Sequence, residues 1–192
     1  MKGKYCVRTR VSDLRADPKS RSERVSQSIF RETVEVLEDS GEDYVKVRAP
    51  DGYEAYTMRY AIGPSRGRIL YKIVETWKGG DIILPIGSLL SQSDIDRSRV
   101  PRKYLREMEY RQYLLKFAER YLGVPYLWGG VTEMGIDCSG FTQRIYSFNG
   151  LLLHGNADMQ EKLGSEVASL KDAEKGDLVF FPGHVAMYAG DG

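Results

Sequence analysis

Short apolar segments separated by turn-forming residues run through the first third of the chain. Apolar and polar residues alternate over a few positions and then give way to Asp-Pro, Ser-Gly or Asp-Gly, a pattern typical of half-buried strands joined by tight turns. The predicted strands are Tyr5–Val7, Arg24–Phe30, Thr33–Leu37, Tyr44–Val47 and Tyr53–Met58. Their regular spacing predicts a small β-barrel over residues 1–62.

A second β-rich region follows this barrel. It opens with the linker-like segment Gly63–Gly67. Two apolar runs, Ile69–Val74 and Asp81–Leu84, lie on either side of a Lys-Gly-Gly turn and predict further strands. We therefore assign residues 63–100 to a linker and a partial second barrel.

From residue 101 onward, helical spacing appears beside strand-like runs. Apolar residues three and four positions apart predict a helix over Tyr104–Tyr121. A second helix is predicted to begin near Cys138, because Asp137 is a favourable N-cap and apolar residues recur at helical spacing after it. This mixture indicates a domain of the α+β class at residues 101–192.

Cys138 is the leading candidate for a chemical role. It falls in the first turn of the predicted helix, where the positive end of the helix favours a thiolate. A lone cysteine is more often a buried structural residue, which is the role we expect for Cys6. The neighbours of Cys138 favour a nucleophile, because Asp137 can cap the helix and Gly140 leaves room for a close approach.

The chain has two histidines that could act as the base for this nucleophile. His184 opens an apolar strand after a Pro-Gly turn, a rigid position for an imidazole. His154 follows three leucines and leads into a loop, which favours a role at the surface or in support of the reacting residues. Cys138 and His184 together indicate a cysteine hydrolase that acts through a thioester.

Four motifs in the second half occur in the order and at the spacing of one enzyme family. They are Tyr126–Gly130, Asp137–Phe141, Gly176–Phe181 and Gly183–Tyr188. From about Tyr110 to its end, the chain resembles the NlpC-type cell-wall cysteine peptidases, papain-like α+β enzymes that cut peptidoglycan stem peptides at γ-D-glutamyl bonds. The resemblance implies that Cys138 is the nucleophile, His184 the base and Tyr126 a donor near the oxyanion. The alternative for Tyr126 is a core aromatic with a satisfied hydroxyl.

The first domain resembles a bacterial SH3-like domain through Leu14–Pro18, Glu23–Phe30 and Asp51–Tyr53. In relatives that take free stem peptides, such a domain contacts the amine end of the ligand. The resemblance implies this role for Glu23 and Tyr53, and a substrate-binding role for Asp137 and Ser139 beside the nucleophile. The alternatives are a solvated charge for Glu23 and a barrel aromatic for Tyr53.

The chain departs from the family pattern in two places. Family members carry a third polar residue, usually His, on the strand after the base, and this sequence ends at Gly192 before that strand. The resemblance therefore implies a C-terminally truncated domain without its orienting residue, which strand exchange or a second chain could complete. His154–Asn156 stands where relatives commonly have Pro, Arg and Asp, which predicts an altered substrate subsite.

Composition narrows the possible functions. The 192 residues are 42% hydrophobic and 29% charged with a net charge of +1, which allows two small cores. The absence of a Lys/Arg run argues against a nucleic-acid partner. The first residues lack the apolar stretch of a signal peptide, so we expect no membrane insertion and a cytoplasmic location, or export followed by signal removal. Neither a glycine-rich phosphate loop nor a Cys/His cluster is present, so we expect no cofactor or metal.

These observations predict an endopeptidase that hydrolyses the γ-D-glutamyl-diamino acid bond of peptidoglycan stem peptides. Its expected partner is a stem peptide or a murein tripeptide or tetrapeptide. The main alternative is a catalytically degenerate protein that binds the cell wall or has a regulatory role. A third class is an amidase or acyltransferase that uses the same Cys-His pair.

Overall fold

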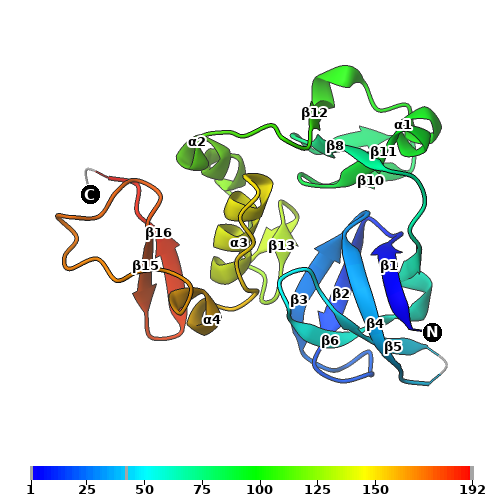
Figure 1. The fold of residues 1–192 in the computed structure, drawn as a ribbon, viewed down its shortest axis with the longest axis horizontal. Coiled ribbons are helices and arrows are strands. Elements are labelled where there is room, and N and C mark those ends of the chain that lie inside the picture. The colour runs from blue at the N-terminus through cyan, green and yellow to red at the C-terminus, as the bar shows by residue number, and fades with distance from the viewer. Residues whose placement is uncertain (1, 42, 191–192) are drawn as a thin grey trace. The chain divides into compact units, whose positions relative to one another are not determined.

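The protein consists of two compact units. A computed structural model describes residues 2–41 and 43–190 and divides the chain into Met1–Tyr110 and Arg111–Gly192 (Figure 1). The division falls ten residues after the boundary at residue 100 expected from the sequence. The end of the chain at Asp191-Gly192, after which the family pattern predicts a further strand, lies outside the described residues.

The first unit begins with an antiparallel sheet whose strand order is β3-β2-β6-β5-β4-β1-β7. Its strands are β1 Gly3–Val7, β2 Val11–Arg15, β3 Arg24–Ile29, β4 Thr33–Asp39, β5 Tyr44–Arg48, β6 Glu54–Met58 and β7 Ile62–Pro64. The five strands predicted from the alternating pattern are confirmed. The pattern missed β2, because one of its inward positions is polar: Ser12 is 5% exposed and bonds to Thr57 Oγ1 at 2.6 Å.

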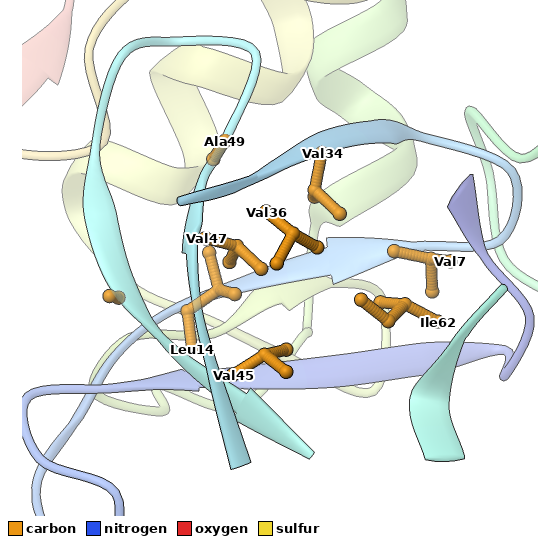
Figure 2. Close-up of a cluster of buried hydrophobic side chains, with 9 residues drawn as sticks. Val7, Leu14, Val34, Val36, Val45, Val47, Ala49 and Ile62 are labelled. Carbon is orange, nitrogen blue, oxygen red and sulfur yellow. The ribbon is translucent and has the colours of Figure 1, made fainter. Parts of the chain in front are cut away.

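The core of this barrel is made of small aliphatic side chains. Figure 2 shows them converging from β1, β2, β4, β5 and β7. The cluster contains Val7, Leu14, Val34, Val36, Val45, Val47, Ala49, Ala55 and Ile62. Because burial of each Val, Leu or Ile contributes about 1.5–3 kcal/mol, this cluster is a main source of stability for the first barrel.

A second β-rich layer completes the first unit. Its elements are β8 Ile69–Ile73, β9 Trp77–Gly79, β10 Ile82–Leu84, β11 Leu89–Ser91, helix α1 Gln92–Ser98 and β12 Leu105–Glu107. Strand β8 pairs with β11 and β12, and β9 pairs with β10. A separate core forms around Ile73, Trp77 and Leu90, and Phe30 of the first barrel packs against it.

The second unit is built around helix α3. Its elements are α2 Leu114–Ala118, β13 Val131–Thr132, β14 Gly135–Ile136, α3 Cys138–Phe148, α4 Ala157–Glu161, β15 Leu178–Phe181 and β16 His184–Met187. Helix α3 packs against α2, β13 and β16 (Figure 1). Phe117 of α2 stacks on Phe148 of α3 with ring centroids 3.9 Å apart, and Ile145 and Val185 are also buried. The strands of this unit pair as two antiparallel hairpins, β13 with β14 and β15 with β16, and are not joined into a parallel sheet by the helices, which agrees with the α+β class.

The predicted helix over Tyr104–Tyr121 is wrong for most of its length. Leu105, the apolar residue that begins the periodic pattern, belongs to β12 and is buried against β8. Only α2 and a short 3₁₀ turn, Glu119–Tyr121, are helical in the later part of the range. Pairing with β8 therefore overrides the helical spacing at the start of this segment. None of the helices in the described ranges is long and apolar enough to cross a membrane.

Candidate active site

The start of α3 is fixed by the carboxylate of Asp137. This residue is the N-cap, and its Oδ1 accepts a hydrogen bond from the backbone N–H of Gly140 at 2.7 Å. Its Oδ2 accepts another from the N–H of Gly129, also at 2.7 Å. One side chain therefore joins the first turn of the helix to the loop that precedes β13. The helix start and capping residue predicted from the sequence are confirmed.

Glycine is required where that loop meets the helix. A Cβ on Gly140 would lie 2.3 Å from the carbonyl oxygen of Gly130, a backbone atom that cannot move aside easily. The same carbonyl accepts a hydrogen bond from the N–H of Asp137 at 3.1 Å. Tyr126 forms an isolated parallel bridge with Ile136, which brings the start of the loop beside the helix. The segment Leu127–Gly130 thus forms a turn beside the start of α3, closed by a hydrogen bond from the Gly130 N–H to the Leu127 carbonyl at 2.8 Å.

Cys138 is the first residue of α3, and its thiol is free and half-buried. The first N–H groups of a helix have no partner within it, so they present partial positive charge at this end. Partial positive charge at this position can stabilise negative charge that develops on a reacting group. The other cysteine, Cys6, is 2% exposed in the first barrel, which agrees with the structural role expected for it.

His184 opens β16, as predicted, and its side chain is exposed. The strand is held in a hairpin by its pairing with β15, in which His184 lies opposite Phe181. The next residue, Val185, is 2% exposed, and β16 packs on α3. The structure thus places the strand carrying the imidazole against the helix carrying the thiol. Within residues 2–41 and 43–190, no hydrogen bond joins these two side chains, and such bonds often form only when substrate is present.

Tyr126 lies within electrostatic range of Cys138. Partial burial and the nearby charges of Cys138 and Asp137 raise the pKa of its hydroxyl. The hydroxyl is therefore protonated at neutral pH and can donate a hydrogen bond. The side chain is 62% exposed, which argues against the alternative of a core aromatic.

Ser139 and Gln160 brace the first turn of α3 from the other side. Ser139 is 6% exposed, and its hydroxyl donates to the carbonyl of Gly155 at 3.0 Å. Gln160 of α4 is 2% exposed and donates to the carbonyls of Ser139 at 2.9 Å and His154 at 2.7 Å. Thr142 Oγ1 bonds to Gln160 Oε1 at 2.6 Å. These contacts position the backbone that carries the thiol.

The sequence did not point to Gln160. A glutamine in a short polar segment is typical of a solvent-exposed helix, and no local pattern distinguishes a buried one. Nor did it indicate that His154 would act through its backbone carbonyl. His154 itself is half-buried, and its carbonyl takes part in the support of the site, in line with the second of the two roles expected for it.

Two other sequence-predicted residues lie in the first unit. Glu23 is exposed just before β3, and its carbonyl accepts a hydrogen bond from Ala16. Tyr53 is half-buried just before β6 and packs against the core of the barrel. Strands β3 and β6 both flank β2 and are antiparallel to it, so the two residues lie at the same end of the sheet.

The site has the groups needed for acyl transfer. A half-buried thiol lies at a helix start, a phenol hydroxyl lies within electrostatic range of it, and an imidazole lies on the strand packed against the helix. The described part of the chain contains no group of three His, Cys, Asp or Glu residues arranged to hold a metal ion.

Comparison with known proteins agrees with this geometry. Residues 123–192 match the NlpC/P60 family, and residues 14–57 match the bacterial dipeptidyl-peptidase Sh3 domain. Dipeptidyl-peptidase 6 of Lysinibacillus sphaericus is 27% identical over an alignment 225 residues long. The alignment covers 94% of this chain and 82% of that protein. A gamma-D-glutamyl-L-lysine dipeptidyl-peptidase of Bacillus cereus is 39% identical over 87 residues. That match covers 41% of this chain and 26% of the Bacillus cereus protein.

A solved structure extends the comparison to the fold. The crystal structure of an NlpC/P60 family protein from Bacillus cereus superposes with a TM-score of 0.82 at 19% identity. The superposition covers 98% of this chain and 88% of the other. At this identity the likeness establishes the fold alone. Together with the sequence matches, it indicates a bacterial SH3-like domain around residues 14–57 and an NlpC/P60 domain with a papain-like fold at residues 123–192.

Proposed function

We propose that this protein hydrolyses the γ-D-glutamyl-diamino acid bond of peptidoglycan stem peptides through a thioester on Cys138. The observation that carries the proposal is the open thiol at the start of α3, with the Tyr126 hydroxyl near it. The names of the relatives support the choice of bond, because one of them is a gamma-D-glutamyl-L-lysine dipeptidyl-peptidase. The choice of wall peptides is also supported by the NlpC/P60 match.

The proposed reaction has two steps. In the first, Cys138 Sγ attacks the γ-carbonyl carbon of the glutamyl residue, and the oxyanion accepts hydrogen bonds from the Cys138 N–H and the Tyr126 hydroxyl. The C–N bond then breaks, and His184 gives the thiol proton to the departing amine. In the second step, His184 takes a proton from water, the hydroxide attacks the thioester, and the free carboxylate leaves as the thiol is restored.

The amine end of the substrate is the second part of the proposal. The Asp137 oxygens each accept one backbone hydrogen bond, and a carboxylate oxygen can accept a further one. Asp137 can therefore receive an ammonium group while still capping the helix. We extend this role to Glu23 and Tyr53 by analogy with relatives that take free stem peptides, and we place the reaction on such peptides in the cytoplasm.

Mass spectrometry of a defined peptide tests the chemistry. The substrate is L-Ala-γ-D-Glu-meso-diaminopimelate, used alongside the L-Lys peptide and an N-acetylated form. We expect release of the diamino acid by the wild type and none by Cys138→Ala or His184→Ala. The chain supplies matched controls, since Cys6→Ala and His154→Ala remove the other cysteine and the other histidine and should retain cleavage.

The same experiment separates the proposal from its alternatives. Slower cleavage of the N-acetylated peptide would support recognition of the amine. Cleavage that persists in Cys138→Ala would exclude the thioester mechanism. If no peptide is cut while the chain still sediments with purified wall, the wall-binding or regulatory alternative is favoured; turnover of simple amides alone would indicate an amidase or acyltransferase.

A further inference from the structure

The first unit contains a cavity remote in sequence from Cys138. It has a volume of about 280 Å³ and is open on one side. Its walls come from the turn between β1 and β2, the end of β3, the β9–β10 hairpin, β11 and α1. All of these elements belong to the unit Met1–Tyr110, so the cavity is complete without the second unit.

The inner surface of this cavity is largely apolar. It is formed by Phe30, Ile83, Leu84 and Leu90, of which Leu84 and Leu90 are at most 3% exposed. Two backbone hydrogen bonds hold Phe30 in place. Its N–H donates to the carbonyl of Arg10, and its carbonyl accepts from the N–H of Leu89. A pre-formed apolar surface of this kind is suited to an apolar group of a ligand.

Three arginines stand at the rim. Arg8, Arg10 and Arg97 line the cavity, and all three are exposed. In the described part of the chain, none of them forms an ion pair or hydrogen bond through its guanidinium. Arg8 lies across Gly63, where an added Cβ would come within 2.2 Å of Arg8 Cδ, so the glycine permits this position of the side chain.

The carboxylates of the cavity do not balance these cations. Asp94 is paired with Arg31, which donates to both of its oxygens at 2.9 Å. Asp81, at the tip of the β9–β10 hairpin, is the other acidic residue in the lining. Three guanidinium groups thus face one uncompensated carboxylate, and the rim is positive.

We propose that this cavity binds a small ligand that carries a carboxylate beside an apolar side group, which is the chemistry of the C-terminal residue of a short peptide. The rim arginines would hold the carboxylate, since a guanidinium matches its geometry with two parallel hydrogen bonds. The apolar surface would receive the side chain. A volume just below the usual range for drug-sized ligands fits one residue rather than a long acyl chain. This site is independent of the proposed peptidase reaction.

Isothermal titration calorimetry tests the proposal with a defined probe. The protein is the full chain with Cys138→Ala, which prevents turnover, and the probe is N-acetyl-L-alanyl-L-leucine. The C-terminal amide of the same peptide differs only in lacking the charge. We expect the acid to bind at least about tenfold more tightly than the amide, with affinity that falls as salt is raised.

Variants locate the binding. Arg10→Gln and Arg97→Gln should each weaken the acid about fivefold to tenfold, while Arg66→Gln, an exposed arginine outside the cavity, should leave it unchanged. Gly63→Ala displaces Arg8 without altering charge and should also weaken binding. Equal affinity for acid and amide, or no heat with either up to about 10 mM, would overturn the proposal. So would an Arg66→Gln effect as large as that of Arg97→Gln.

Discussion

Each unit contains an aspartate at the start of a helix, and the two carboxylates are satisfied in different ways. Asp94, in the first turn of α1, is 6% exposed and accepts from the Ser91 N–H at 2.9 Å and from the Arg31 guanidinium. Asp137, the N-cap of α3, is half-buried and accepts hydrogen bonds from the N–H groups of Gly129 and Gly140 and from the Ser139 hydroxyl. Within residues 2–41 and 43–190, one carboxylate pairs with a cation and the other accepts from neutral donors.

This difference separates a structural contact from a potential binding contact. Arg31 links the loop after β3 to α1 through its ion pair with Asp94. The charge of Asp94 therefore holds two parts of the first unit together. Asp137 keeps its charge beside the half-exposed thiol of Cys138. A buried ion pair costs desolvation that its attraction must offset, whereas a half-buried carboxylate keeps acceptor capacity for a ligand.

The largest expected effect comes from breaking the ion pair of the first unit. Arg31→Met leaves Asp94 buried without its cation, so the free energy of unfolding should fall by about 3–5 kcal/mol. Urea unfolding followed by the fluorescence of Trp77, which is 7% exposed in the adjacent core, measures the change in a Trp128→Phe background. Adding Asp94→Asn removes the unpaired charge and should restore a large part of the loss. If the double variant is no more stable than Arg31→Met, the explanation by an unpaired charge is wrong.

The sequence could predict the barrel around this ion pair but not the pair itself. Alternation identified β1 and β3 to β6 because their inward positions are aliphatic. Arg31 and Asp94 are 63 positions apart, and charged residues are expected at the surface unless a partner is known. Arg31 also has φ of 68°, an uncommon conformation for arginine that no local motif indicates.

The next effect concerns catalysis in the second unit. If Tyr126 donates to the oxyanion, Tyr126→Phe should lower kcat/KM about 100-fold, the low end for such a donor, because the ring is 62% exposed. Steady-state hydrolysis of the tripeptide measures this. Tyr113→Phe is the matched control, since Tyr113 is 59% exposed in the same unit and lies outside the site. An unchanged kcat/KM in Tyr126→Phe would remove this residue from the mechanism.

A smaller effect is expected when the cap of α3 is removed. Asp137→Ala deletes the acceptor for the Gly129 and Gly140 N–H groups, and the free energy of unfolding should fall by about 1 kcal/mol. Asp137→Asn retains an acceptor and should recover most of the loss. Asp158→Ala, at an exposed position in the first turn of α4, serves as the control. Equal stabilities for the Ala and Asn variants would show that capping is not what Asp137 contributes.

Within the site, the sequence predicted those features that depend on residues close together along the chain. The cap at Asp137, the helix start at Cys138 and the strand that opens at His184 all follow from residue types a few positions apart. The contact of Gly140 with the Gly130 carbonyl and the support from Gln160 depend on segments brought together by folding. Periodicity carries no information about such contacts, and for the same reason it placed a helix where β12 pairs with β8.

The smallest expected effect is a pH dependence at the surface of the first barrel. Hydrogen bonds from Arg48, at 2.7 Å, and from Lys46 hold the pKa of the Glu54 carboxyl below its ordinary value. Because the folded-state pKa is lowered, the contribution is complete above about pH 5 and is lost as the pH falls through the ordinary value near 4.3 toward the lower folded one. The melting temperature of Glu54→Gln should therefore lie slightly below that of the wild type at pH 7 and meet it near about pH 3.

Glu75→Gln is the control, because Glu75 is an exposed glutamate of the same unit, and it should show no such convergence with pH. Raising the salt concentration to about 0.5 M should reduce the effect of Glu54→Gln at pH 7 by screening the charges. A Glu54→Gln deficit that persists at low pH would mean that its side chain stabilises the barrel by packing rather than by charge.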